Sequence, residues 1–353
     1  MPDPTVSVSI VTCNSSVYIE RCLESVLTQE GVHLDVVVVD NASTDETVRV
    51  LEAFRDRIHI LRNDRNLGFA TAQNQGILHS SSSWVLVLNP DVLLTSGFVR
   101  GLLEAAELDP RAGAICGKLL SIGPGFEPLA EPLIDSTGIY FTPAMRHFDR
   151  GWHEPDRGRY ERREYVFGAT AAAALYRRQM IEDVAVDGEF FDPDFFVYRE
   201  DADVAWRAQL LGWRCIYTPT ALAHHVRTVS PENRRSLSPA VNMHSVKNRF
   251  LLRIKNLTPD LARRHLLPMT LRDVLVVGGC LLAEPASLPA FWHLAKGLRR
   301  ALQRRRATMS RRVLPDRDLA SWFSFDPAAQ PVAAPTPVEL PPPILPSRAT
   351  AAS

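Results

Sequence analysis

Asp91 is a single carboxylate at a position where it could bind a divalent cation. It follows the apolar run Trp84–Leu88 through the turn Asn89-Pro90. Because Asn, Pro and Asp all favour turns, Asp91 is either an ordinary turn residue or a carboxylate aimed at a divalent cation. Mg²⁺ or Mn²⁺ can be held by one or two carboxylates together with substrate phosphates. A single Asp beside Asn89 suits that arrangement better than it suits a structural metal site.

A second carboxylate pair, Glu200 and Asp201, follows a segment in which acidic and aromatic residues alternate. A helical pattern begins there, with Val204 and Ala208 on its apolar side. One interpretation makes the pair ordinary first-turn carboxylates, which the helix dipole favours. The other is a pair partly desolvated by neighbouring aromatic rings. Such burial raises a carboxyl pKa towards the value that a general base needs.

Histidine and basic residues downstream offer further ligands. His224 and His225 follow the last predicted strand, and either could be a third metal ligand, although most histidines are structural or exposed. Lys247, Arg249 and Arg253 fall on a predicted helix. They form either a solvated basic face or a clamp on a diphosphate.

The strand Val36–Val39 is the clearest of the elements that must position these residues. Four consecutive Val residues predict a strand buried on both faces, as in parallel sheets covered by helices. It ends at Asp40, and the following Ser43–Glu46 segment fits a capping box that starts a helix. Asp40 therefore lies at the carboxyl end of a central strand, the edge where open α/β sheets bind ligands.

The same strand-and-helix unit repeats along the first half of the chain. Apolar runs at Val6–Val11, Ile58–Leu61 and Trp84–Leu88 predict strands, and helical patterns run to Leu27 and from Gly68 to His79. This alternation predicts βαβ units around a parallel sheet. Polar residues gather after the strands and predict a nucleotide-binding crevice on one edge: Thr12, Asn14, Asp40, Asn41, Asn63, Asn66, Asn89 and Asp91.

The chain divides into three predicted parts. Residues 1–235 form a catalytic domain, with a nucleotide-binding half at 1–120 and an acceptor and catalytic half at 121–235. Within the second half, 121–164 form a long excursion or hairpin over the active site, and strands follow at Thr170–Tyr176 and Trp213–Thr218. Residues 236–324 are helical. The Pro- and Ala-rich tail 325–353 has little to bury and is expected to be disordered.

Composition limits the class of protein. A hydrophobic share of 46% supplies an ample core, and a formal net charge of zero gives no argument for nucleic-acid binding. The five cysteines are scattered and lack CxxC spacing, which indicates a reducing compartment and no zinc knuckle. The amino terminus lacks the pattern of a signal peptide. We therefore expect a cytoplasmic protein.

One late apolar run raises the question of a membrane. Val274–Ala283 is too short to span a bilayer, which takes about 20 residues. Phe291 and Trp292 follow it, and then arginine clusters. The segment is either a helical pair packed on the catalytic domain or a peripheral face on the inner side of the cell membrane.

Together these segments resemble the family 2 glycosyltransferases of the GT-A fold, especially their bacterial rhamnosyltransferase-like branch. The resemblance spans about residues 6–230 and rests on the order and spacing of several motifs: Val8–Ser15, Val38–Asp45, Asn66–Ala70, Leu88–Asp91, Phe167–Thr170, Phe191–Phe196, Tyr198–Asp203, Arg207 and Gly212-Trp213. It implies an α/β fold with a mostly parallel central sheet, flanking helices and a C-terminal helical extension.

The resemblance also implies an activity and roles for residues. The expected enzyme is an inverting, metal-dependent transferase. It moves a sugar, with rhamnose as one candidate, from a nucleotide-diphospho-sugar to a glycan or lipid-linked saccharide in bacterial cell-envelope polysaccharide biosynthesis. Asp201 matches the catalytic base, with Glu200 beside it, and Asp91 and His225 match the ligands of Mg²⁺ or Mn²⁺. Thr12, Asn14, Asp40, Asn41, Asn66, Gly68 and Asn89 are expected to bind the donor.

Two other functions compete with this one. A sugar-phosphate nucleotidyltransferase usually carries a Gly-rich basic loop after its first strand, and Thr12–Ser15 is not such a loop. A non-catalytic nucleotide-sugar-binding protein would be favoured by loss of Asp91 or Asp201, and both are present. Release of free nucleoside diphosphate from candidate sugar donors would separate a glycosyltransferase from a non-catalytic binding protein.

Overall fold

The computed structural model describes residues 5–227, 238–326 and 330–331. Its strands are β1 Thr5–Thr12, β2 His33–Asp40, β3 His59–Arg62, β4 Trp84–Leu88, β5 Val92–Leu94, β6 Ala112–Ser121, β7 Ile134–Ser136, β8 Ile139–Phe141, β9 His147–Asp149, β10 Glu164–Val166, β11 Ala173–Arg177, β12 Arg214–His225 and β13 Gln330–Pro331. Its helices are α1 Ile19–Leu27, α2 Thr47–Glu52, α3 Phe69–His79, α4 Phe98–Ala106, α5 Arg178–Val184, α6 Glu200–Leu210, α7 Pro239–Asn256, α8 Pro259–Arg264, α9 Leu266–Leu282, α10 Pro289–Met309 and α11 Asp316–Ala320. Short 3₁₀ turns are η1 Pro193–Phe195 and η3 Pro285–Ser287.

The main sheet has the strand order β13-β10-β12-β6-β11-β4-β1-β2-β3. The pairs β4–β1, β1–β2 and β2–β3 are parallel, as the repeated strand-and-helix pattern predicts. β11 pairs antiparallel with both β4 and β6. Parallel neighbours need a crossover connection, usually a helix, and β11 instead follows the 121–164 excursion. The sheet as a whole is therefore mixed, with parallel and antiparallel pairs.

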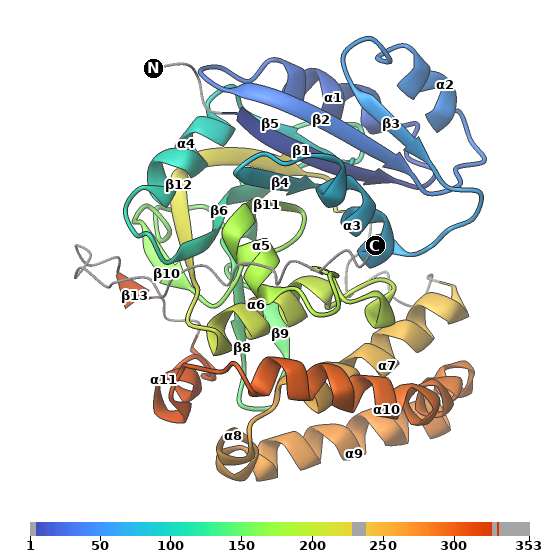
Figure 1. Ribbon diagram of the computed structural model, residues 1–353, viewed down its shortest axis with the longest axis vertical. Coiled ribbons are helices and arrows are strands. Elements are labelled where there is room, and N and C mark those ends of the chain that lie inside the picture. Colours follow the sequence, from blue (N-terminus) through green and yellow to red (C-terminus); the bar gives the residue numbers. More distant parts are fainter. Residues whose placement is uncertain (1–4, 228–237, 327–329, 332–353) are drawn as a thin grey trace, which may run out of the picture.

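Helices cover both faces of this sheet (Figure 1). Apolar side chains of α1, α2 and α4, such as Leu23, Leu51 and Phe98, pack with β1 residues on one face. α3, α5 and α6 pack on the other face. The C-terminal helices form a further layer against α6, whose Trp206 is fully buried. α6 is thus enclosed between the sheet and this layer.

The strand β2 confirms the interpretation of its Val run, since Val36–Val39 are almost completely buried. The capping box is wrong. α2 begins only at Thr47, and Asp45 accepts the Thr47 amide at 3.0 Å. Ser43 Oγ accepts the Asn14 amide at 2.9 Å, so it ties the loop after β2 to the loop after β1.

The remaining elements follow the predicted outline with two differences. The strand predicted at Trp213–Thr218 continues to His225, so both histidines lie at its end and not beyond it. The excursion 121–164 holds the hairpin β8–β9. Much of the tail 325–353 lies outside the described residues. Within the described part, Gln330–Pro331 pair with β10.

Candidate active site

A cavity of about 720 Å³ opens beyond the carboxyl ends of β1, β2 and β4. This size falls within the usual range for small-molecule sites. Nine of the predicted site residues line it: Asn14, Asn41, Asn66, Gly68, Asn89, Asp91, Glu200, Asp201 and His225. Residues from the excursion and from α7 also contribute, including His147, Asp149 and Val241. The segments therefore meet at one edge of the sheet.

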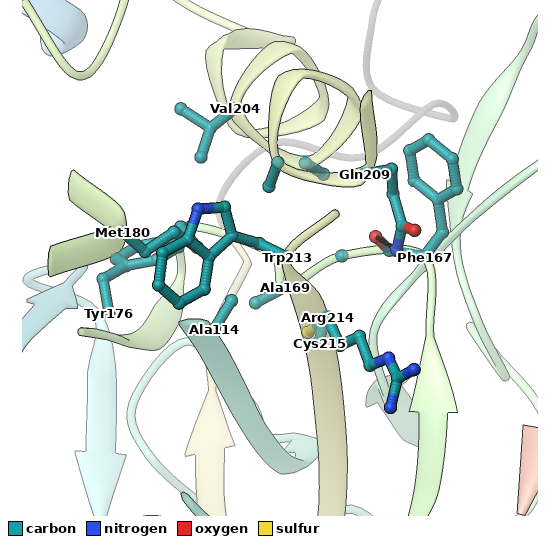
Figure 2. A pocket seen from close by; sticks show the side chains of 13 residues that line it. Ala114, Phe167, Ala169, Tyr176, Met180, Val204, Gln209, Trp213, Arg214 and Cys215 are labelled. Carbon is teal, nitrogen blue, oxygen red and sulfur yellow. Dashed lines mark hydrogen bonds between the residues drawn. The ribbon is translucent and has the colours of Figure 1, made fainter. Parts of the chain in front are cut away.

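A second cavity behind α6 is much smaller, about 10 Å³ (Figure 2). Ala114, Met180 and Trp213 are among the mostly apolar side chains that surround it. This is room for one water molecule at most. We interpret it as a packing gap, so the larger cavity is the candidate site.

Three asparagines cross-link the loops at the nucleotide end of the cavity. Asn41 Nδ2 donates to Asn66 Oδ1 at 2.9 Å, and Asn14 Oδ1 accepts the Thr44 amide at 2.8 Å. Asn66 Oδ1 also accepts the amide of Gly68, whose φ of +82° suits glycine. A Cβ at Gly68 would lie 2.5 Å from the Phe196 ring. These contacts hold the loops in one arrangement before any ligand binds.

Thr12 and Asp40 require a correction, because neither lines the cavity. Both are buried, and Thr12 Oγ1 donates to Asp40 Oδ1 at 3.1 Å. Asp40 Oδ2 accepts the amide of Ser43 at 3.2 Å. The Asp40 carboxylate is occupied by the turn at Ala42, whose φ is +65°. The expected direct contact with the donor becomes an indirect one, through the shape of the loop.

Asp91 and His225 face each other across the cavity wall. His225 Nε2 lies 3.4 Å from Asp91 Oδ1, and both side chains are largely buried. On its other side, His225 Nδ1 lies 2.8 Å from the fully buried Asp135. Burial alone would lower the pKa of His225, but Asp135 and Asp91 outweigh burial and raise the pKa to about 10. Since neighbours on a strand point to opposite faces, His224 does not line the cavity.

The donor set at Asp91 and His225 fits a divalent cation. No group of three or more His, Cys, Asp or Glu side chains able to hold a metal occurs within the described residues. One carboxylate and one imidazole suffice where phosphate oxygens complete the coordination, but the raised pKa of His225 means that a cation would have to displace the proton of this ring in order to bind there. Asp135 fixes the orientation of the His225 ring, as outer carboxylates do for metal-bound histidines.

The sequence interpretation missed several residues of this wall. Arg227 Nε lies 2.5 Å from Asp135 Oδ1, and its Nη2 lies 2.6 Å from Asp149 Oδ2. Arg199 Nη1 lies 3.2 Å from His147 Nδ1, and both residues line the cavity. His147 and Asp149 come from β9, so the excursion does reach the site. For His147 and Asp149, the charge density of the excursion is the only signal that the sequence contains.

The two carboxylates at the start of α6 differ in their surroundings. Asp201 accepts backbone amides from Ala202 at 2.7 Å and from Ala171 at 3.3 Å. Burial and the nearby Asp149 raise its pKa to about 6. Burial and Asp201 raise the pKa of Glu200 further, to about 8. Burial therefore makes both carboxyl groups harder to ionise than usual, and the proximity of Asp201 opposes ionisation of Glu200.

The loop that precedes α6 is strained and is held by α7. Phe196, Tyr198 and Arg199 all have positive φ, between +65° and +74°. The fully buried Asn248 of α7 donates through Nδ2 to the carbonyls of Phe195, Val197 and Tyr198, each at 2.8 Å. Residues in such conformations persist only where their surroundings hold them. Asn248 thereby positions the carboxylates that follow.

The predicted basic face on α7 also requires a correction. Lys247 Nζ donates to the Asp194 carbonyl at 2.5 Å, and Arg253 pairs with Asp273 at 2.8 Å. Lys247 and Arg249 are buried, and none of the three residues lines the cavity. The segment is neither a solvated face nor a diphosphate clamp. It is a packed face that holds neighbouring segments in place.

Asn248→Asp is expected to lower both stability and turnover. The change keeps the shape but removes the two N–H donors that three loop carbonyls share, of which the Phe195 carbonyl is buried and the other two are partly buried. Each buried carbonyl left without a donor costs about 1–3 kcal/mol. We expect a loss of roughly 3 kcal/mol or more in the free energy of unfolding, measured by denaturant titration. The surface change Gln303→Glu is the matched control, and wild-type stability and kcat in Asn248→Asp would rule out the positioning role.

Comparison with known proteins places these features in context. The family model of glycosyl transferase family 2 matches residues 7–185. An N-acetylglucosaminyl-diphospho-decaprenol L-rhamnosyltransferase of Mycobacterium tuberculosis is 30% identical over 234 residues, which cover 61% of this chain and 74% of that protein.

Solved structures share the fold at low sequence identity. A mannosyltransferase from Pyrobaculum calidifontis, solved with GDP-Man and Mn²⁺, has a TM-score of 0.50 at 17% identity, covering 87% of this chain and 83% of its own. Residues 1–349 of TarS from Staphylococcus aureus, solved with UDP-GlcNAc, give a TM-score of 0.52 at 16% identity, covering 86% and 88%. The family model matches half of the chain, and the solved structures share its sheet and the crevice at the carboxyl edge. The protein therefore belongs to glycosyl transferase family 2 and has the GT-A fold.

Proposed function

We propose that this glycosyltransferase moves rhamnose from a nucleotide-diphospho-sugar to a saccharide or lipid-linked saccharide, with inversion at the anomeric carbon. The observation that carries the proposal is that Asp91, in the turn after β4, and Asp201, at the start of α6, line one cavity. The relative from Mycobacterium tuberculosis supports rhamnose as the sugar and a lipid diphosphate as the acceptor carrier. The reaction would contribute to cell-envelope polysaccharide synthesis.

The chemistry assigned to the chain's own residues is proton removal and orientation. A sugar hydroxyl is a weak nucleophile, so its proton must leave during the attack. Asp201, with a pKa of about 6, accepts that proton near neutral pH. Glu200 stays protonated and can donate a hydrogen bond to a sugar oxygen. Direct displacement by the acceptor oxygen breaks the bond to the diphosphate and inverts the anomeric carbon.

The leaving diphosphate carries charge that must be stabilised. Asp91 and His225 are the residues proposed to hold Mg²⁺ or Mn²⁺, which would neutralise that charge when bound. Arg227 lies next to this pair, within the same cavity. Its guanidinium is anchored by Asp135 and Asp149. These two ion pairs orient the Arg227 guanidinium before the donor binds, so the side chain need not move when the donor arrives.

The cytoplasm is the proposed location of the reaction. All five cysteines are free, including the four buried ones, which fits a reducing compartment. This location remains a proposal that rests on cysteine chemistry and on the expected donor.

A donor panel tests the assigned reaction. Release of nucleoside diphosphate would be measured with rhamnosyl, mannosyl and N-acetylglucosaminyl donors, with and without an N-acetylglucosaminyl-diphospho-lipid acceptor and Mn²⁺. We expect the fastest acceptor-dependent release from the rhamnosyl donor, and a product with inverted anomeric configuration by NMR. If the donors bind but release no nucleoside diphosphate, the chain is a non-catalytic binding protein. Release of pyrophosphate from a nucleoside triphosphate would favour a nucleotidyltransferase.

A further inference from the structure

The helix α9 is exposed along one whole face, and that face is apolar. Its exposed positions are Leu266, Leu267, Thr270, Leu271, Val274, Leu275, Gly279, Leu281 and Leu282. None of them is charged. The large side chains among them are 59–90% exposed. An uninterrupted apolar surface of this kind on a soluble domain marks an interaction site.

The opposite side of α9 accounts for its packing on the rest of the protein. Met269, Val276 and Cys280 contact the neighbouring apolar clusters, and Asp273 pairs with Arg253. These four positions recur every three or four residues, so they share one face of the helix. Leu267, Leu271, Val274 and Leu275 lie on the other face. α9 lies at the edge of the molecule (Figure 1), and the side chains on its second, apolar face are exposed.

Neither α9 nor α10 alone is a membrane-spanning helix. Among the described residues, no single helix has the length and apolar character to cross a bilayer. α9 and α10 meet that test only as a pair, and the chain turns by 113° between them. A face that lies along a surface fits this geometry better than a helix that crosses it.

The exposed charged residues of α10 are basic, and the helix carries no acidic residue. Residues 259–312 contain eleven Lys and Arg against three Asp and Glu, but several of these cations pair with acidic residues elsewhere, as Arg300 does with Glu189 and Asp194. On α10, Trp292, Lys296 and Arg299 are exposed at positions i, i+4 and i+7, so they share one face. Trp292 is 70% exposed and follows α9 after one short turn. An exposed Trp beside basic residues is typical of a protein surface at the headgroup level.

Not all of the arginine clusters are available, which corrects the sequence interpretation. Arg304 is buried and pairs with Glu189 and Asp192, and Arg305 donates to the carbonyls of Ile254 and Leu257. Arg311 pairs with Asp183, and Arg312 with Asp316. These groups hold α10 on the protein. Lys296 and Arg299 are the exposed basic residues nearest to Trp292.

We propose that the outer face of α9, flanked by Trp292, Lys296 and Arg299, docks the enzyme on an anionic lipid bilayer. The apolar side chains would enter the acyl boundary, and the basic side chains would contact anionic headgroups. The exposed Lys296 and Arg299, on a helix without acidic residues, favour an anionic bilayer over a second copy of the chain, because two basic surfaces repel each other. The inference goes beyond the transfer reaction and does not depend on it.

The test uses the full chain and vesicles that contain no saccharide acceptor. Flotation would be measured with vesicles of phosphatidylcholine alone and of phosphatidylcholine with phosphatidylglycerol, at low and at high salt. We expect binding to the anionic vesicles that weakens with salt. The double variant Leu271→Glu/Leu275→Glu is expected to reduce the bound fraction roughly tenfold or more. Lys296→Glu/Arg299→Glu should remove the preference for anionic vesicles.

The matched control places two carboxylates on other exposed apolar residues. Leu78 and Val313 are 73% and 63% exposed and lie outside α9 and α10. Leu78→Glu/Val313→Glu should float like the wild type, and nucleotide binding by calorimetry should be unchanged in all variants. Wild-type protein that never floats, or an α9 variant that floats equally well, overturns the proposal. The wild type could instead be a dimer that does not float and that Leu271→Glu/Leu275→Glu converts to a monomer. That result would assign the face to a second copy of the chain.

Discussion

Asp201→Asn is expected to leave donor binding intact and to lower kcat by roughly 10² to 10⁴, the usual contribution of a general base. Asn has nearly the same shape, but its amide cannot accept the proton from the acceptor hydroxyl. Ala202 and Ala171 donate to different oxygens of Asp201, so the single Asn oxygen can keep only one of these two backbone contacts. Donor affinity by calorimetry and kcat by diphosphate release together measure the effect.

The neighbouring variant Glu200→Gln is the control for this assignment. Burial and Asp201 raise the pKa of Glu200 and favour its neutral form, so replacing it with a neutral amide should change kcat much less. The wild-type rate should also rise with pH through about 6, because Asp201 must lose its proton before it can act as a base. A nearly active Asp201→Asn together with an inactive Glu200→Gln would reverse the assignment. If the rate instead rises with pH near 4, the usual pKa of an exposed Asp, burial does not raise the pKa of the base.

Asp91→Ala is expected to abolish transfer and to make nucleotide binding independent of Mn²⁺, while the fold survives. The change removes one of the two side chains proposed to hold the cation. The metal-dependent part of donor affinity should disappear with it. Calorimetry of nucleoside diphosphate binding, with and without Mn²⁺, provides a reading that does not require turnover.

The exposed carboxylate Asp64 gives the matched control for Asp91. It lies between β3 and α3 and does not line the cavity. Asp64→Ala should keep the Mn²⁺ dependence and the activity of the wild type. Circular dichroism and thermal unfolding would establish that Asp91→Ala remains folded. If that variant retains Mn²⁺-dependent binding of normal affinity, Asp91 is not a metal-binding residue.

Local patterns predicted the parallel half of the fold well, since the responsible interactions are short-range. The Val run of β2, the exact span of β4 and the end of α1 at Leu27 follow from periodicity and burial. The location of Asp91 at a strand end and of Asp201 at a helix start follows in the same way. Their roles remain predictions.

The parts that were missed depend on contacts between distant residues. Asp40 looks like a donor-binding carboxylate from its position, but Thr12 and Ser43 already occupy its oxygens. Asp135 is 90 residues from His225 in the chain, and no local pattern connects the two. The α7 face looks basic and solvated by periodicity alone. Only the packed structure shows that it holds the loop before α6.

The contacts of α7 with that loop have a consequence for synthesis of the chain. Asn248 and Phe323 emerge from the ribosome well after Asp201, and Phe323 packs on the buried Trp206 at 5.1 Å between ring centroids. Until they arrive, the loop carbonyls lack their donor and α6 lacks one side of its core. Domains form in order from the amino terminus during translation. The loop before α6, and with it Glu200 and Asp201, therefore reaches its final geometry only near the end of translation, so this part of the cavity is completed last.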